Sequence, residues 1–183
     1  MPPVKAEQWL ELFALQPTIS GDASSWARAF AARPRAGWEA CPRGEWLVAA
    51  AVRARVDPRE VVSALATTIS AISNELDRMG RPEPPALRRT IELAEAWADG
   101  VAELEELRGA ERALDGEANE LARRLLRTTI EAATDGASLA ERAAQAMHAL
   151  GDPLGPRGHE ATAAVLRSLL AWERVEAAIT APK

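Results

Sequence analysis

The sequence predicts an all-α protein, and its composition and patterning support this prediction. Alanine dominates the 48% of the 183 residues that are hydrophobic, tyrosine is absent and β-branched residues are few, which favours helix over strand. Between the Gly and Pro residues, apolar residues recur three and four positions apart, as on one face of a helix. We therefore expect about eight or nine helices, arranged as a multi-helix bundle or as an array of helical hairpins.

Gly and Pro residues divide the first part of the chain into four predicted helices. These cover Lys5 to Gln16, Asp22 to Ala32, Gly44 to Arg55 and Pro58 to Met79. Asp57 can cap the fourth helix, Pro58 fits its first position, and Glu60 stands where a capping-box carboxylate reaches back. This helix is the predicted centre of the core, because one of its faces is apolar. That face consists of Val61, Leu65, Ile69, Ile72 and Leu76.

Four further helices are predicted in the rest of the chain. They cover Pro84 to Asp99, Ala102 to Thr134, Ser138 to Leu150 and Arg157 to Ile179. Glycines interrupt the second of these, so two helices bent near Asp115-Gly116 are the alternative to one. Ser138 and Glu141 form a second capping-box pattern. Glycines also stand where carboxy-terminal helix caps belong, at Gly80, Gly100, Gly136 and Gly151.

Length and composition predict one helical domain over residues 1–183, since no linker rich in Pro, Ser and Gly divides the chain. The single cysteine excludes an internal disulfide, and the amino terminus lacks the basic start and apolar run of a signal peptide. The longest uncharged stretch, Val61 to Asn74, has 14 residues, fewer than the roughly 20 that a membrane span needs. We therefore expect a cytoplasmic protein with no membrane-spanning segment.

The sequence contains no recognisable catalytic or metal-binding motif. His148 and His159 are its two histidines, and no carboxylate spacing joins them into a zinc motif. Cys41 lacks the surroundings of a cysteine hydrolase, which favours a buried structural thiol. The segment from Gly151 to Gly158 is predicted to be a connecting loop, with anion binding as the alternative. We expect no enzymatic activity, metal or cofactor; catalysis through Cys41 or the His159 loop is the alternative.

The strongest electrostatic feature is an acidic segment from Glu92 to Glu120. It holds ten acidic residues and two arginines, within a chain of net charge −5. This pattern fits a solvated helix face or a docking surface that steers a basic protein partner. Nucleic-acid binding by this segment is not expected, because phosphate contacts need clustered Lys and Arg. The predicted partner-binding acids are Glu92, Glu95, Asp99, Glu103 and Glu106.

Six tryptophans are a second unusual feature of a chain without tyrosine. They are Trp9, Trp26, Trp38, Trp46, Trp97 and Trp172. Most lie beside other apolar residues and are predicted to belong to the core. Tryptophan is also enriched in interface hot spots. Trp38 lies in a predicted loop before Cys41-Pro42, so we include it among the candidate partner-binding residues.

Several motifs resemble a family of immunity proteins from bacterial polymorphic toxin systems. In order along the chain they are Cys41 to Leu47 (CPRGEWL), Val56 to Arg59 (VDPR), Arg88 to Gly100 (RRTIELAEAWADG) and Glu105 to Arg108 (EELR). The resemblance covers residues 36–115, and residues 1–35 and 116–183 flank it. It implies a helical, cytoplasmic protein that neutralises a toxin by binding it rather than by catalysis.

Together, these features predict a non-enzymatic helical module that binds a protein, such as a basic toxin, through its acidic surface. The alternative, from another functional class, is a structural or adaptor subunit that self-associates or joins a larger assembly through apolar helix faces and tryptophans. A stable homo-oligomer of the purified chain would favour this alternative.

Overall fold

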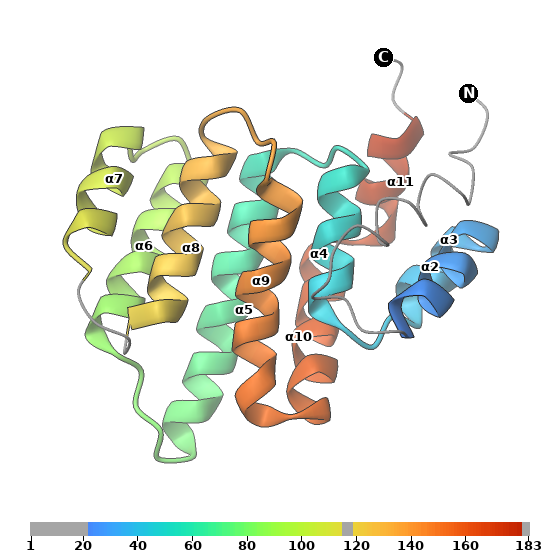
Figure 1. The fold of residues 1–183 in the computed structure, drawn as a ribbon, viewed down its shortest axis with the longest axis horizontal. Coiled ribbons are helices and arrows are strands. Elements are labelled where there is room, and N and C mark those ends of the chain that lie inside the picture. Colours follow the sequence, from blue (N-terminus) through green and yellow to red (C-terminus); the bar gives the residue numbers. More distant parts are fainter. Residues whose placement is uncertain (1–21, 115–118, 181–183) are drawn as a thin grey trace.

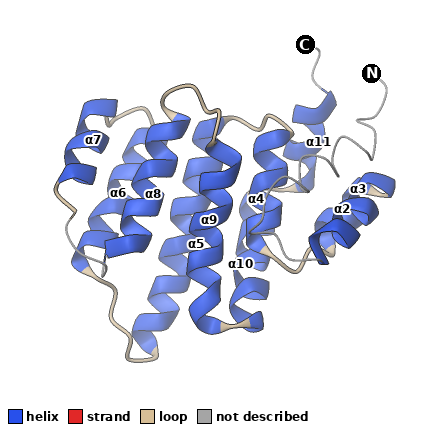
Figure 2. Cartoon of the chain, in the orientation of Figure 1, coloured by secondary structure: helices blue, strands red, loops and turns tan. Residues whose placement is uncertain are grey.

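The structure, a computed structural model, describes residues 22–114 and 119–180, and these residues form only helices and connecting turns (Figures 1 and 2). The all-α prediction is therefore confirmed for this part of the chain. The α-helices are α2 (Asp22–Ala32), α3 (Pro34–Glu39), α4 (Gly44–Arg53), α5 (Pro58–Arg78), α6 (Pro85–Ala98), α7 (Leu104–Arg112), α8 (Glu120–Ala132), α9 (Leu139–Gly151), α10 (Pro156–Leu169) and α11 (Trp172–Thr180). A 3-10 helix, η2 (Asp152–Leu154), links α9 and α10.

Three sequence predictions lie outside the described residues: the helix from Lys5 to Gln16, the position of Trp9, and the bend at Asp115-Gly116. The segment predicted from Ala102 to Thr134 does contain two helices, α7 and α8. Within the described ranges, no helix has both the length and the apolar character that crossing a bilayer requires.

The long helix α5 occupies the centre of the core, as its apolar face predicted. Its Val61, Leu65 and Ile69 are fully buried. It packs against α4, α6, α8, α9 and α10, while α6, α7 and α8 extend the array to one side and α2, α3 and α11 to the other (Figure 1). Buried apolar side chains from α2 through α11 form one continuous cluster. The described parts of the regions that flank residues 36–115 therefore share the core of the middle region.

Local capping chemistry was predicted correctly at some helix ends and wrongly at others. Asp57 Oδ1 accepts a hydrogen bond from the Arg59 backbone at 2.8 Å, as a cap should. Glu60 instead pairs with Arg174 at 2.6 Å. The capping box predicted at Ser138 does not form, because Glu131 at the end of α8 accepts from the Ser138 backbone at 2.8 Å.

Three of the four predicted glycine caps adopt the left-handed conformation. Gly80, Gly100 and Gly136 have φ values of +79°, +79° and +69°. Gly151 was wrongly predicted as a cap: its φ is −79°, and the chain continues directly into η2. The left-handed glycine of this region is Gly155, with φ +64°.

The predicted helix from Arg157 to Ile179 is broken at Leu170. Leu170 has φ −102° and ψ 75°, values outside the helical region, and its side chain is 1% exposed. The break turns α11 so that the Trp172 ring lies 6.1 Å from Phe30 and 6.3 Å from Trp38. Burial of Leu170 and Trp172 therefore accompanies the bend, although the residue pattern alone was compatible with one continuous helix.

Candidate functional site

Ionisable side chains from three helices meet where α4, α9 and α10 pack together. They are Arg43 and Glu45 at the start of α4, His148 in α9 and His159 in α10. Two hydrogen bonds fix the backbone of the segment that precedes α4. The Cys41 thiol donates to the Arg43 carbonyl at 3.3 Å, and the Arg167 guanidinium of α10 donates to the Cys41 carbonyl. These bonds fix the amino-terminal end of α4 against α10. We call the four ionisable side chains the Arg43 cluster.

Gly151 and Gly158 allow α9 and α10 to approach closely beside this cluster. A Cβ atom at Gly158 would collide with the Gly151 carbonyl oxygen and with Leu154. A Cβ atom at Gly151 would lie 2.7 Å from His159 Nδ1. The segment predicted as a loop is therefore a tight helical connection, and His159 lies inside α10 rather than in an exposed loop.

Replacing Gly158 with Ala is expected to lower the free energy of unfolding by about 2 kcal/mol, because the collision outweighs the higher helix propensity of Ala. Urea denaturation followed by circular dichroism would measure the change. Gly109→Ala is the matched control, since a Cβ atom there meets nothing within 4 Å, and a gain of about 0.5–1 kcal/mol is expected. Equal effects of the two substitutions would contradict the close approach of α9 and α10.

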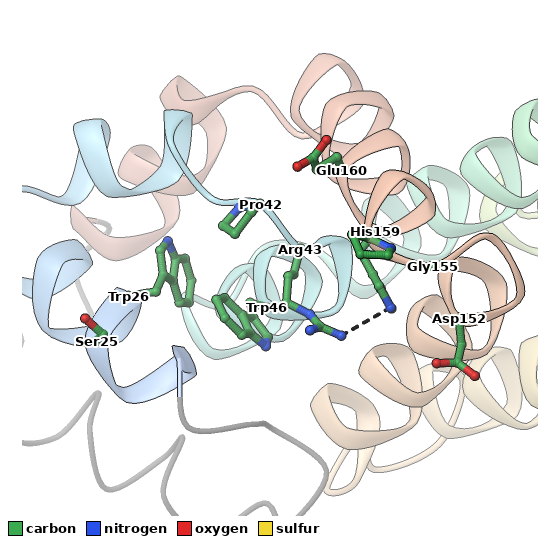
Figure 3. A pocket seen from close by; sticks show the side chains of 10 residues that line it. Ser25, Trp26, Pro42, Arg43, Trp46, Asp152, Gly155, His159 and Glu160 are labelled. Carbon is green, nitrogen blue, oxygen red and sulfur yellow. Dashed lines mark hydrogen bonds between the residues drawn. The ribbon is translucent and has the colours of Figure 1, made fainter.

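The carboxylate of Glu45 lies at the centre of the cluster. Arg43 Nε donates to Glu45 Oε1 at 2.5 Å, and Arg43 Nη2 lies 3.3 Å from His159 Nε2 (Figure 3). His159 Nδ1 is 3.4 Å from Glu45 Oε2, and His148 Nδ1 is 3.6 Å from Glu45 Oε1. The two imidazole rings stack with centroids 5.4 Å apart. Both histidines therefore turn the same ring nitrogen toward one carboxylate.

Burial makes this arrangement energetically demanding. Glu45 is 4% exposed and His159 8% exposed. Glu45 Oε2, His148 Nδ1 and His159 Nδ1 are buried, and none forms a hydrogen bond with another described residue. A buried polar atom without a partner costs about 1–3 kcal/mol. The cluster thus holds one carboxylate oxygen and two imidazole nitrogens that none of its hydrogen bonds uses.

Two clefts reach the cluster. One, of about 650 Å³, is lined by Trp26 and Trp46 together with Arg43 and His159, whose guanidinium and imidazole groups are drawn in Figure 3. The other, of about 570 Å³, is lined by Glu45, His148 and Asp152 among others. Small ions and water can reach the cluster through these openings.

Cys41 has the structural role that the sequence analysis favoured. Its side chain is buried, and burial raises the pKa of the thiol to about 12, while the hydrogen bond to the Arg43 backbone and the Arg167 charge act in the opposite direction. At neutral pH the thiol is therefore protonated, whereas the nucleophilic form of cysteine is the thiolate. This geometry argues against catalysis through Cys41.

The predicted partner-binding acids lie on α6 and at the start of α7. Glu92 and Asp99 are exposed and Glu95 is half-buried, on the α6 face that points away from the core. Glu103 and Glu106 are exposed, but they form a capping box at the start of α7, where Glu106 Oε2 accepts from the Glu103 backbone at 2.7 Å. The five residues therefore differ in position: Glu92 and Glu95 lie on α6, and Asp99 is the cap residue at its carboxy-terminal end. The other two stabilise the start of α7.

Trp38 lies in a helix rather than in the predicted loop, and its side chain is buried. It lies in α3, which begins at Pro34, and it is 1% exposed. Its ring packs near Trp172 in an aromatic cluster that also contains Trp26 and Phe30. Trp38 therefore belongs to the core, as the sequence analysis predicted for most of the tryptophans.

Sequence reasoning missed the Arg43 cluster because its members are distant along the chain. Metal and catalytic motifs are recognised from short spacings, whereas Glu45 precedes His148 by a hundred residues. The useful signal was indirect: two histidines flank a connection in which Gly151 and Gly158 permit tight helix packing.

Comparison of the chain with protein-family models, curated proteins and solved structures finds no match.

Proposed function

We propose that the protein is a non-enzymatic binding module that engages a basic protein partner through the acidic face of α6, in the manner of an immunity protein. The observation that carries the proposal is that the acids of this face are not paired with neighbouring basic groups. Glu92, Glu95 and Asp99 form no ion pair within 4.0 Å with another described residue. Their negative charge remains to attract a cationic surface.

Other acids in the same part of the molecule are paired within it. Glu105 lies 3.1 Å from Arg112, and Glu111 lies 2.7 Å from Arg127 of α8. Glu120 pairs with two arginines of its own helix. The negative charges of Glu105, Glu111 and Glu120 are therefore neutralised by nearby arginines, whereas those of the α6 acids are not. Glu103 and Glu106 also form no ion pair within 4.0 Å with a described residue, but they form the capping box of α7, so we place the docking surface at Glu92, Glu95 and Asp99.

The partner is a cationic protein, such as a nuclease or another toxin that depends on positive charge. Complementary charge increases the association rate and disfavours partners of the wrong sign. The resemblance of the motifs between Cys41 and Arg108 to immunity proteins supports the same class of partner. The location that fits this role is the cytoplasm, where such a toxin acts.

The alternative of a self-associating adaptor has less support from the described surface. Its exposed large hydrophobic residues are Met79, Val101 and Leu169, which lie on separate elements. An obligate interface needs a larger apolar area than isolated side chains supply. Charge at α6 therefore favours a partner of a different kind over a second copy.

The test uses a triple variant in which Glu92, Glu95 and Asp99 are changed to Lys. Glu103 and Glu106 are left unchanged, because replacing them would also remove the capping box of α7. We expect the variant to bind the partner at least about tenfold more weakly, with most of the loss in the association rate at low salt. Capture from native lysate, followed by affinity measurement on the purified partner, would determine this.

The matched control changes Asp77, Glu141 and Glu176 to Lys, three exposed acids on α5, α9 and α11. This variant has the same change in net charge but should bind like the wild type. Equal affinities for all three proteins would reject the α6 surface. Recovery of only the chain itself would favour the adaptor alternative.

A further inference from the structure

We propose that Glu45, His148 and His159 bind a divalent transition-metal ion of the zinc class. The three residues offer two imidazole nitrogens and a carboxylate oxygen from three different helices, with ligand atoms that all lie within 4.8 Å of one another. Nitrogen and carboxylate ligands of this kind suit Zn²⁺ and its neighbours, whereas Mg²⁺ and Ca²⁺ prefer oxygen ligands.

The distances between the donor atoms fit such an ion. Zinc bonds of about 2.0–2.1 Å in tetrahedral geometry place neighbouring ligand atoms about 3.3 Å apart. In the cluster, Glu45 Oε2 lies 3.4 Å from His159 Nδ1, and Glu45 Oε1 lies 3.6 Å from His148 Nδ1. With one ligand atom from each residue, all three atoms lie within 4.8 Å of one another. These separations are long for hydrogen bonds but close to those around a bound metal.

The donor atoms are also the ones without partners. Glu45 Oε2, His148 Nδ1 and His159 Nδ1 are each buried without a hydrogen bond to a described residue. One ion placed among them would satisfy all three atoms at once. If hydrogen bonds alone held these side chains together, at least one imidazole nitrogen would lie about 2.7–3.2 Å from a Glu45 oxygen.

The outer surroundings differ for the two histidines. Asp152 Oδ1 lies 3.9 Å from His148 Nε2. In metal sites, the ring nitrogen that does not bind the metal commonly faces a carboxylate, which orients the ring. Arg43 occupies the corresponding side of His159, at 3.3 Å from Nε2. A metal-bound His159 carries its proton on Nε2, so the guanidinium must withdraw. The Arg43 side chain is 24% exposed and lines an open cleft, which gives it room to move.

Arg43 and the metal ion are therefore alternative positive charges for Glu45. Without metal, Arg43 compensates the buried carboxylate directly. With metal, the ion takes this role and the arginine turns toward the cleft. The other cleft, of about 570 Å³, admits the ion beside His148, whose side chain is 43% exposed, and leaves space for water as a fourth ligand.

Titration of the untagged, metal-free full chain with Zn²⁺ by calorimetry tests the site, and Co²⁺ serves as a second probe because its visible absorption reports tetrahedral coordination. We expect one ion per chain. His148→Asn should weaken binding by at least tenfold without loss of the fold, since His148 is the most exposed of the three ligands. Glu45→Gln should weaken binding further.

Glu160→Gln is the matched control, because Glu160 is an exposed carboxylate next to His159. Its affinity for Zn²⁺ should equal that of the wild type. Absence of zinc binding by the wild type, or unchanged affinity of folded His148→Asn, would overturn the proposal. The experiment requires no partner protein, so its result is independent of the function proposed for α6.

Discussion

Replacing Trp38 with Ala is expected to lower the free energy of unfolding by about 3–5 kcal/mol, the usual cost of truncating a large aromatic side chain in a packed core. Trp38 is 1% exposed, and its ring lies 6.3 Å from that of Trp172. Its removal would leave a cavity between α3 and α11 that neighbouring side chains fill only in part. Urea denaturation followed by circular dichroism would measure the loss.

Trp38→Phe is the matched control. The Trp38 indole nitrogen is buried without a hydrogen bond to a described residue, so phenylalanine removes an unpartnered polar group while it keeps an aromatic ring in place. We expect this variant to lose less than about 1.5 kcal/mol. If Trp38→Ala were as stable as the wild type and lost only partner binding, Trp38 would be an interface residue, and its placement in the core would be incorrect.

The helices themselves could be predicted because their signals are local. The apolar spacing of α5, the cap at Asp57 and the left-handed glycines at Gly80 and Gly100 each depend on residues within a few positions. Such patterns determine where a helix lies and which face it buries. They were sufficient for the fold class and for the central position of α5.

Where a helix cap or a helix end was predicted wrongly, contacts between helices explain the difference. Ser138 fits a capping box by pattern, yet Glu131 from the preceding helix accepts from its backbone. Leu170 is a good helix former, yet the helix breaks there as Leu170 and Trp172 enter the aromatic core. In both cases a contact with another helix competed with a local preference and prevailed.

The two candidate sites differ in the same way. The acids of α6 were visible in the sequence because their spacing along one helix defines a shared face. The Arg43 cluster was not visible, because it depends on how α4, α9 and α10 pack. Residue type alone indicated a buried thiol at Cys41, but the grouping of Glu45 with two histidines required the tertiary structure.

Replacing Arg43 with Met is expected to destabilise the metal-free protein by about 3 kcal/mol, because it leaves the buried carboxylate of Glu45 without its cation. Removing one partner of a buried ion pair typically costs about 3–5 kcal/mol, and the partial exposure of Arg43 places the value at the low end. Arg78→Met is the control: Arg78 and Glu75 form an exposed ion pair, and its loss should cost less than about 1 kcal/mol.

Added Zn²⁺ should then raise the unfolding temperature of Arg43→Met by more than that of the wild type, because the ion supplies the missing positive charge and no longer competes with a guanidinium. Ligands that bind only the folded state stabilise it in proportion to the logarithm of their concentration over Kd, so tighter binding gives a larger shift. An equal zinc response in both proteins would show that Arg43 and the metal do not share Glu45. If Arg43→Met lowered the free energy of unfolding of the metal-free protein by no more than Arg78→Met does, the Glu45 carboxylate would not depend on Arg43.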